Sequence, residues 1–360
     1  MMPLKPLLSA QFLSFMVSAS GIFTESLATD CGINIPTFQT FLVYTLLSLF
    51  TLKLHKRQYV NDPSIDSKPY RICSLLGSTP NSLKLSSPWY YYLLISFLDV
   101  ESNFLVVTSF KMTSLTSISL IDCTSIPFVM FFSKLLLSRS YIPPQYLAAL
   151  ISVLGILLII LSDTFYPLTS STGTTSPSPL LGDIICLCGA FLYALNNVLC
   201  EKFVKVDRYE YLGMMGFFAS IISAAQMVVL EREEVEKLFV EEGRCSSWRS
   251  GGLIGGYVVS IASFYVLVTG FLVDNSAALL NVSLLTADVY SLIFVVIAEK
   301  VVPGWLYFLG TLVVFWGVGL FNYHEKSQEG GREEGEGIGE SDKSDLLRSR
   351  SPSREPIIEP

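Results

Sequence analysis

Two apolar stretches of the sequence each carry an aspartate near their middle. Asp122 lies in SLTSISLIDCTSIPFVMFF, residues 114–132, and Asp288 lies in NVSLLTADVYSLIFVV, residues 281–296. A charge at the centre of a bilayer costs at least about 2.5–3.5 kcal/mol, so an acid placed there usually serves a function. Each carboxylate could bind a cationic group, carry protons, or do both. A hydrogen bond between packed helices, made by the neutral acid, is the alternative that stays open.

Other polar side chains accompany these aspartates on helical faces or in separate apolar blocks. Ser119 precedes Asp122 by one helical turn, and Asn281 precedes Asp288 by two. Amides and phenols in such positions can hydrogen-bond a heterocyclic or sugar-like solute on which an aromatic ring stacks. The residues expected to bind substrate are Asp122, Asp288, Glu101, Asn103, Tyr193, Asn197, Ser119 and Asn281.

A third acidic group stands in the stretch LDVESNF, which begins an apolar block. Asp99 is expected at the membrane interface, whereas Glu101 and Asn103 are expected to lie deeper. On a helix, Glu101 points nearly opposite to Asp99, so the two acids do not form one carboxylate face.

The composition indicates the elements that must position these groups. Of the 360 residues, 51% are hydrophobic and only 15% are charged, and the mean hydropathy is +0.52. A soluble chain would carry roughly a quarter charged residues. The apolar residues form blocks of about 20, enough to cross a hydrocarbon core of roughly 30 Å. The sequence therefore predicts a polytopic membrane protein.

Ten spans are expected, and they should be helices, because lipid offers no hydrogen-bond partner to a free backbone group. The fold class is thus all-α, with a disordered C-terminal tail rich in Gly, Glu and Ser. A loop at 231–251 is Glu-rich and nearly helix-like. The expected spans are 7–27, 36–54, 89–109, 115–137, 144–163, 181–204, 210–230, 252–273, 278–299 and 303–323.

The fourth and ninth spans resemble each other in sequence. Pairing Asp122 with Asp288 also pairs Lys134 with Lys300, while a second register would pair Asp122 with Thr286. Five spans separate the two segments, and an odd number inverts the second copy in the membrane. Inverted repeats of this kind place a transporter's substrate site near the midplane. The expected units are residues 1–163 and 181–323 as five-helix repeats, 164–180 as a connecting loop, and 324–360 as the tail.

Lys and Arg concentrate in the loops that share a side with both termini, which predicts cytoplasmic ends. The loop 231–251 is the one discordant segment, since its four basic residues fall on the opposite side.

The tail contains DKSDLL, which resembles a sorting signal toward endosomal or vacuolar membranes. A sorting adaptor at Asp342, Leu346 and Leu347 is one expected partner, beside the lipid bilayer and a small-molecule substrate. A homodimer is left open, no nucleic-acid partner is expected, and endomembrane and plasma membrane both fit.

Several classes of enzyme and cofactor site do not match the sequence. Seven dispersed cysteines without a recurring CxxC predict neither a disulfide framework nor a zinc site. Both histidines lie outside the expected spans, so no metal site in the membrane is expected. No GxxxxGK[ST] loop is present, which argues against ATP hydrolysis as a driving force. The aspartate contexts LIDCT and TADVY do not fit an intramembrane aspartyl protease. No catalytic residue and no cofactor are expected.

Five stretches of the sequence are specific enough to indicate a family: DVESNF, TSLTSISLIDCTSIP, GAFLYALNNVLCEKFVK, EYLGMMGFFASIISAAQMVVLER and NVSLLTADVYSLIF. Through them the chain resembles solute carrier family 35, F branch, in the drug/metabolite transporter superfamily with its EamA-like repeats, over about residues 10 to 323. The resemblance implies ten helices in two inverted five-helix repeats, cytoplasmic ends and alternating access.

The expected function is a secondary-active transporter or exchanger of a small polar organic solute. A non-transporting membrane scaffold or a channel-like protein is the alternative. The paired acids favour a carrier, because a scaffold has no need for a charge at the membrane midplane.

Overall fold

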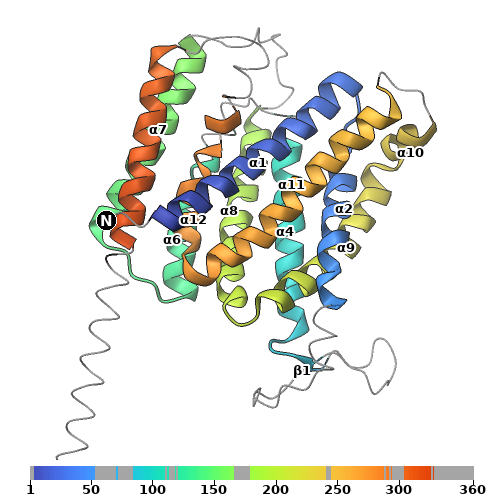
Figure 1. The fold of residues 1–360 in the computed structure, drawn as a ribbon, viewed down its shortest axis with the longest axis horizontal. Coiled ribbons are helices and arrows are strands. Elements are labelled where there is room, and N and C mark those ends of the chain that lie inside the picture. Colours follow the sequence, from blue (N-terminus) through green and yellow to red (C-terminus); the bar gives the residue numbers. More distant parts are fainter. Residues whose placement is uncertain are drawn as a thin grey trace, which may run out of the picture.

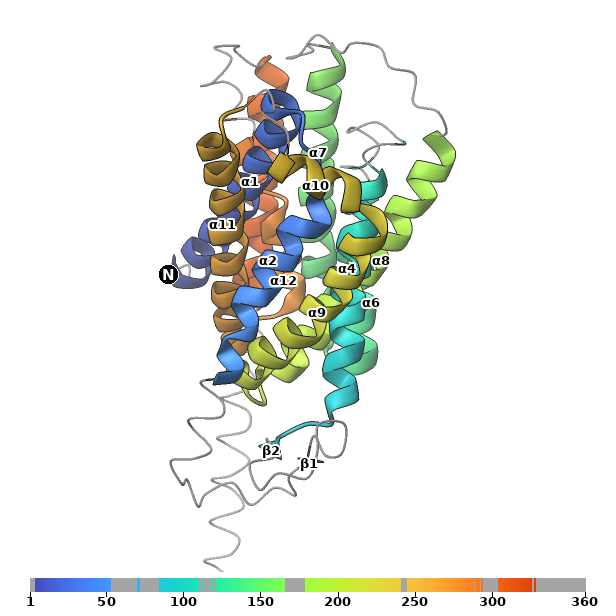
Figure 2. The same cartoon turned by 90° about the vertical axis from the view of Figure 1, so that its right-hand side faces the viewer.

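The structure is a computed structural model, and its described residues form a bundle of helices (Figures 1 and 2). Apart from the helices there is one short antiparallel pair of strands, β1 and β2. The described residues are 4–52, 70–71, 84–109, 112, 118, 121–165, 179–240, 245–287, 289–291, 293, 304–325 and 327. Ser119, Asp288 and most of the tail, with its expected sorting signal, lie outside them.

Most helices overlap the expected spans, whereas α6 and α12 cover only part of the fourth and ninth. Their bounds are α1 Leu4–Cys31, α2 Pro36–Ser48, α4 Trp89–Ser109, α6 Ser125–Leu136, α7 Pro143–Phe165, α8 Pro179–Val204, α9 Arg208–Leu230, α10 Arg232–Val240, α11 Ser247–Asp274, α12 Ala277–Leu284 and a last helix Trp305–Glu325, and the strands are β1 Tyr70–Arg71 and β2 Lys84–Leu85. Within the described part, six helices are long and apolar enough to cross a membrane: α1, α4, α8, α9, α11 and the last helix. The expectation of a multi-pass helical membrane protein is confirmed at this level. The loop that was expected to be nearly helix-like forms α10.

Short polar links determine where neighbouring helices reverse direction. Asp207 caps α9 by accepting hydrogen bonds from the backbone N–H groups of Tyr209 and Glu210. Ser276 caps α12 by accepting from the N–H of Leu279. These side chains satisfy donors that the first helical turn leaves free, so each helix begins directly after the previous one ends.

The fourth expected span is interrupted rather than continuous. A turn precedes α6, in which the N–H and the hydroxyl of Thr124 both donate to the carbonyl of Ile121, at 2.8 and 2.6 Å. The ninth span is interrupted in the same way after α12, where Thr286 donates twice to the carbonyl of Ser283, at 3.1 and 2.7 Å.

The two turns can be aligned with each other. Aligning Thr124 with Thr286 pairs Asp122 with Leu284 rather than with Asp288. The next backbone hydrogen bonds are also alike in the two segments. The N–H of Phe128 donates to the carbonyl of Thr124, and the N–H of Tyr290 donates to the carbonyl of Thr286, both at 3.3 Å. Neither expected register matches these hydrogen bonds.

Two ends of the bundle can be distinguished in both views. We call one the α10 end, because it holds α10 and the link from α1 to α2 (Figure 2). The opposite end holds the links from α8 to α9 and from α11 to α12, and we call it the α8–α9 end.

A disulfide joins Cys31 and Cys245 at the α10 end. It connects the last residue of α1 to the segment just before α11, and the two helices pack along each other. Beside it, Arg249 donates to Asp30 at 2.6 Å. The expectation that the cysteines form no disulfide is therefore wrong. The two cysteines are 214 residues apart and carry no spacing signal, so only the packing of α1 on α11 brings them together.

Candidate functional site

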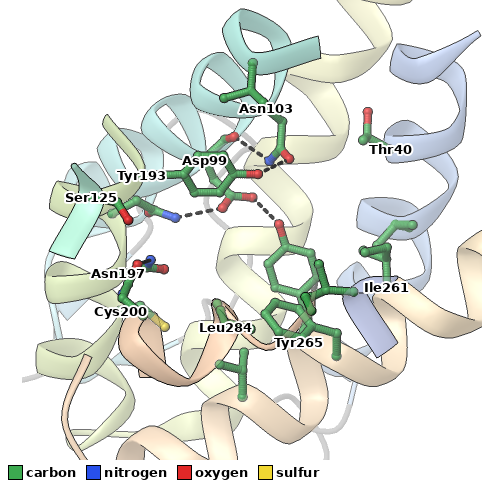
Figure 3. Close-up of a pocket in the computed structure, with 18 of the residues that line it drawn as sticks. Thr40, Asp99, Asn103, Ser125, Tyr193, Asn197, Cys200, Ile261, Tyr265 and Leu284 are labelled. Atoms are coloured by element: carbon green, nitrogen blue, oxygen red, sulfur yellow. Dashed lines mark hydrogen bonds between the residues drawn. The ribbon is translucent and has the colours of Figure 1, made fainter. Parts of the chain in front are cut away.

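A cavity of about 330 Å³ lies at the centre of the bundle, between α2, α4, α8, α11 and the interrupted fourth and ninth spans (Figure 3). Apolar and aromatic side chains make up much of its wall. Its acidic and amide lining groups are Asp99, Asn103, Asp122, Asn196, Asn197 and Asn281.

Asp99 is the most highly connected polar group of the cavity. Its carboxylate accepts hydrogen bonds from the hydroxyls of Tyr44 and Tyr265, both at 2.6 Å, and from the side-chain amide of Asn196 at 2.7 Å. The four residues come from α2, α4, α8 and α11, so a single carboxylate joins four helices. Asp99 is only 2% exposed and stands in the middle of α4. The expectation that it lies at the membrane interface is wrong.

The amide groups of the cavity also pair across helices. Tyr193 of α8 donates its hydroxyl to the carbonyl oxygen of Asn103, whose amide donates to the backbone of Asp99 at 2.7 Å. Asn197, one turn beyond Tyr193, donates to Asn281 of α12 at 3.3 Å. The structure thus brings together polar side chains that the sequence placed in separate spans.

Asp122 occupies a different environment from Asp99. It lines the cavity directly before the turn that precedes α6, and its side chain is exposed. Asp99 is buried and accepts hydrogen bonds from three side chains, whereas Asp122 is an exposed residue of the lining. The cavity therefore contains one buried acid that organises its wall and one accessible acid that can meet a solute.

Glu101 does not line the cavity, although it was expected there. It accepts a hydrogen bond from the side-chain amide of Gln226 at 2.7 Å, between α4 and α9. Two residues along a helix turn a side chain by roughly 200°, so Glu101 points away from the face that carries Asp99 and Asn103. Of the eight expected residues, the structure brings five to the cavity: Asn103, Asp122, Tyr193, Asn197 and Asn281.

Asn196, which lies beside Asn197 in α8, also lines the cavity. It is 3% exposed, and its side-chain carbonyl has no hydrogen-bond partner among the described residues. A buried acceptor without a donor costs about 1–3 kcal/mol, so it is a place where a ligand N–H or O–H would be stabilised.

The charge and shape of the lining define what the cavity can accept. Among the described lining residues there are two carboxylates and no Lys, Arg or His. Six aromatic rings contribute to the wall: Tyr44, Tyr193, Tyr211, Tyr257, Phe264 and Tyr265. Aromatic faces and carboxylates attract cations, and aromatic faces also stack on planar rings. The same lining repels a polyanion, since it offers no positive charge in return.

A helical chain with several membrane-length apolar helices around a polar central cavity belongs to the class of multi-pass integral membrane proteins. A solved crystal structure shares this fold, with a TM-score of 0.63 and 16% sequence identity, over 90% of this chain and 99% of that one. The same arrangement of helices therefore occurs in a protein of very different sequence.

The sequence profile of solute carrier family 35 matches residues 3–65 and 72–325. Solute carrier family 35 member F2 of Mus musculus is 30% identical over 322 residues, which cover 88% of this chain and 78% of the mouse protein. The same member of Xenopus tropicalis is 29% identical, over 78% of this chain and 66% of the frog protein. An uncharacterised solute carrier family 35 member of Schizosaccharomyces pombe is 29% identical over 87% of this chain and 56% of its own length.

The chain belongs to solute carrier family 35. The resemblance noted in the sequence is thereby confirmed. Members of this family are solute transporters and not enzymes, so family membership implies transport of a solute across a membrane.

Proposed function

We propose that the protein is a secondary-active transporter or exchanger of a small polar organic solute, with the central cavity as its binding site. The observation that carries the proposal is the pair of acids in the cavity. Asp99 is hydrogen-bonded within the wall, and Asp122 is an exposed residue of the lining. Desolvated polar groups at the middle of a membrane protein are costly unless they serve a ligand or an ion. The site residues proposed are Asp99, Asp122, Asn103, Tyr193, Asn196, Asn197 and Asn281, with Ser119 and Asp288 retained from the sequence.

We propose ten spans in two inverted five-helix repeats, residues 1–163 and 181–323, which rock about the cavity in alternating access. The matching turns at Thr124 and Thr286 support the repeat, because the same hydrogen bonds recur in the fourth and ninth spans. Interrupted helices of this kind border substrate sites in transporters built from inverted repeats. Residues 164–180 would connect the repeats, and 324–360 would form the tail.

The chemistry of the lining narrows the proposed solute. A cationic group would be attracted to Asp122, and a planar ring would stack on the tyrosines that line the cavity. An amide or hydroxyl of the solute would meet the free carbonyl of Asn196. A cationic or neutral ring-containing solute is therefore favoured over a nucleotide sugar, whose phosphates would find no positive charge among the described lining residues.

We propose that the α10 end faces an oxidising compartment and that both termini are cytoplasmic. The disulfide between Cys31 and Cys245 supports this orientation, because disulfides persist in the secretory lumen or outside the cell and are rare in the cytosol. The distribution of Lys and Arg gives the same orientation independently. The compartment stays open between endomembranes and plasma membrane, as do a sorting adaptor at the tail and a homodimer.

The disulfide provides a direct prediction. If free thiols are alkylated in intact cells, and disulfides are then reduced and labelled with a mass tag, Cys31 and Cys245 should both be protected from the first reagent. Changing both cysteines to serine should lower the free energy of unfolding by about 2–4 kcal/mol, since the closed loop between them is long. Cys188, which is exposed and carries a free thiol, is the control for complete alkylation. Free thiols at both positions in cells would refute the proposed orientation.

The function is tested by untargeted metabolite profiling of cells that express the protein. The comparison is with cells that express Asp122→Asn at equal abundance. A small set of solutes that shifts with the parent protein and not with the variant would support a carrier and identify its class. A shift shared by both would keep the carrier and assign Asp122 a packing role.

Proton coupling gives a separate readout at the same residue. If the proton on Asp122 exchanges during transport, the rate depends on external pH, and Asp122→Asn should flatten that dependence while the protein stays folded. The measurement is uptake of the identified solute between about pH 5 and 8. A variant that keeps the pH profile of the parent would exclude coupling through Asp122.

The scaffold or channel-like alternative predicts different outcomes. A scaffold changes no solute level in either set of cells. A channel conducts without the saturation that a closed binding site imposes, so uptake would rise linearly with solute concentration. Saturable uptake that a second solute accelerates from the opposite side would identify an exchanger.

A further inference from the structure

A buried glutamate at the α8–α9 end is bonded to three separate segments of the chain. Glu201, near the end of α8, is 0% exposed. Its carboxylate accepts from the guanidinium of Arg139 at 2.7 Å, from the ammonium of Lys205 at 2.9 Å, and from the backbone N–H of Ala277 at 2.7 Å. Arg139 also lies 3.5 Å from Glu325.

These partners join parts of the fold that must separate if the cavity opens at this end. Arg139 belongs to the link between α6 and α7, Lys205 follows α8, Ala277 begins α12, and Glu325 ends the last helix. The bond to Ala277 places a carboxylate at the positive N-terminus of α12. One carboxylate therefore holds the start of α12 against α8 and the α6–α7 link.

The cavity lies directly behind this cluster. Cys200, the neighbour of Glu201, lines the cavity and is 6% exposed. Leu272 and Leu285, which flank the start and the end of α12, also line it and are buried. Lining residues nearer the α10 end, such as Thr40 and Tyr257, are partly exposed. This is the pattern of burial that a cavity closed at the α8–α9 end would have.

The cluster contains two acidic and two basic side chains, Glu201 and Glu325 with Arg139 and Lys205, so its charges balance. Such a cluster can exist in a closed and an open arrangement. Burial opposes the charge on Arg139, but Glu201 and Glu325 outweigh it and raise the pKa of Arg139 above its ordinary value. Separating a buried ion pair costs free energy while water is excluded, because each charge is then left without a partner. Once water enters, the separated charges are hydrated, so the open arrangement is also accessible.

We infer that Glu201 is the latch of a gate that closes the cavity toward the α8–α9 end. Opening the gate breaks the bonds from Glu201 to Arg139 and to Ala277, and frees the start of α12 to move away from α8. The inference rests on the proposed alternating access, and it adds the contact that decides which end of the cavity is closed.

Cys200 allows the latch to be tested without knowledge of the substrate. The reporter chain keeps Cys200 and the disulfide, with the four other cysteines changed to alanine: Cys73, Cys123, Cys186 and Cys188. A membrane-impermeant thiol reagent is applied to vesicles of each orientation, and the rate of Cys200 modification is measured from each side. A reporter chain with Cys200→Ala gives the background.

Glu201→Gln should raise the rate from the α8–α9 side at least about tenfold, because the neutral amide no longer binds both cations. It should lower the rate from the α10 side, since the two openings exclude each other. Glu210→Gln is the matched control. Glu210 is buried at the same end, and the hydrogen-bond partners of its carboxylate among the described residues are the N–H groups of Ser86 and Ser87 and the hydroxyl of Tyr92. None of these partners is a basic side chain or a residue of α12. Its rates should stay within about twofold of the reporter chain.

Three outcomes decide the inference. An increase confined to the α8–α9 side, with a decrease from the other, supports the latch. Unchanged rates in Glu201→Gln overturn it. An increase from both sides also overturns it, since Glu201 would then stabilise the fold as a whole. If profiling finds no transported solute while the Cys200 modification rates shift as expected, the latch stands and the proposed transport fails. If profiling finds a transported solute while the modification rates do not shift, the proposed transport stands and the latch fails.

Discussion

Replacing Asp99 with alanine should abolish transport and destabilise the folded protein. The variant removes the acceptor of Tyr44, Tyr265 and Asn196 at once and leaves three donors in a buried place. Each such group costs about 1–3 kcal/mol, so the free energy of unfolding should fall by about 3 kcal/mol or more. The cavity should also lose its shape, because these donors come from three helices that Asp99 holds in place. Thermal unfolding in detergent and metabolite profiling at matched abundance measure the two effects.

Two further variants separate charge from position at this site. Asp99→Asn keeps one acceptor oxygen and the shape of the side chain, so it should restore much of the stability while transport stays low if the charge matters. Glu101→Gln changes the neighbouring acid of α4, which lies outside the cavity and contacts Gln226. It should leave solute levels close to those of the parent. Loss of transport in Glu101→Gln, with normal transport in Asp99→Asn, would contradict the site described here.

Replacing Gly216 with valine should force α2 and α9 apart. A Cβ atom at Gly216 would lie 2.7 Å from the backbone nitrogen of Ser48 and 2.8 Å from the carbonyl carbon of Leu47. Backbone atoms cannot rotate away as the end of a flexible side chain can, so the helices must move. Overpacking of this kind costs about 3 kcal/mol. Because α2 carries Tyr44, the displacement should also weaken the bond to Asp99 and reduce transport.

Gly252→Ala is the matched control for this effect. Apart from the adjacent residues and the nearby backbone of α11 itself, no heavy atom lies within 4 Å of a Cβ atom placed at Gly252. Alanine is favoured over glycine inside a helix by about 0.5–1 kcal/mol, so this variant should be neutral or slightly stabilising. The yield of monodisperse protein and the midpoint of thermal unfolding compare the two. A Gly216→Val protein as stable as Gly252→Ala would show that α2 and α9 are not packed as closely as the structure has them.

The polar residues of the cavity were partly predictable from the sequence. Asn103, Asp122, Tyr193, Asn197 and Asn281 stand out because polar groups are rare in apolar blocks of membrane length, and all of them line the cavity. Asp99 was assigned to the interface because its block begins only about ten residues earlier. Tyr44 and Tyr265 gave no signal, since tyrosine is common in membrane helices and at their ends.

The sequence by itself determined that the chain is a multi-pass helical membrane protein of solute carrier family 35. Hydrophobicity over about 20 residues is a local property, and a helix in lipid satisfies its own backbone, so neither depends on distant contacts. Only the tertiary structure decided that Asp99 joins four helices and that Cys31 meets Cys245. Each of these depends on which helices pack together and in which rotation. Packing among apolar helices is specified by shape across many residues, and no short stretch of sequence contains it.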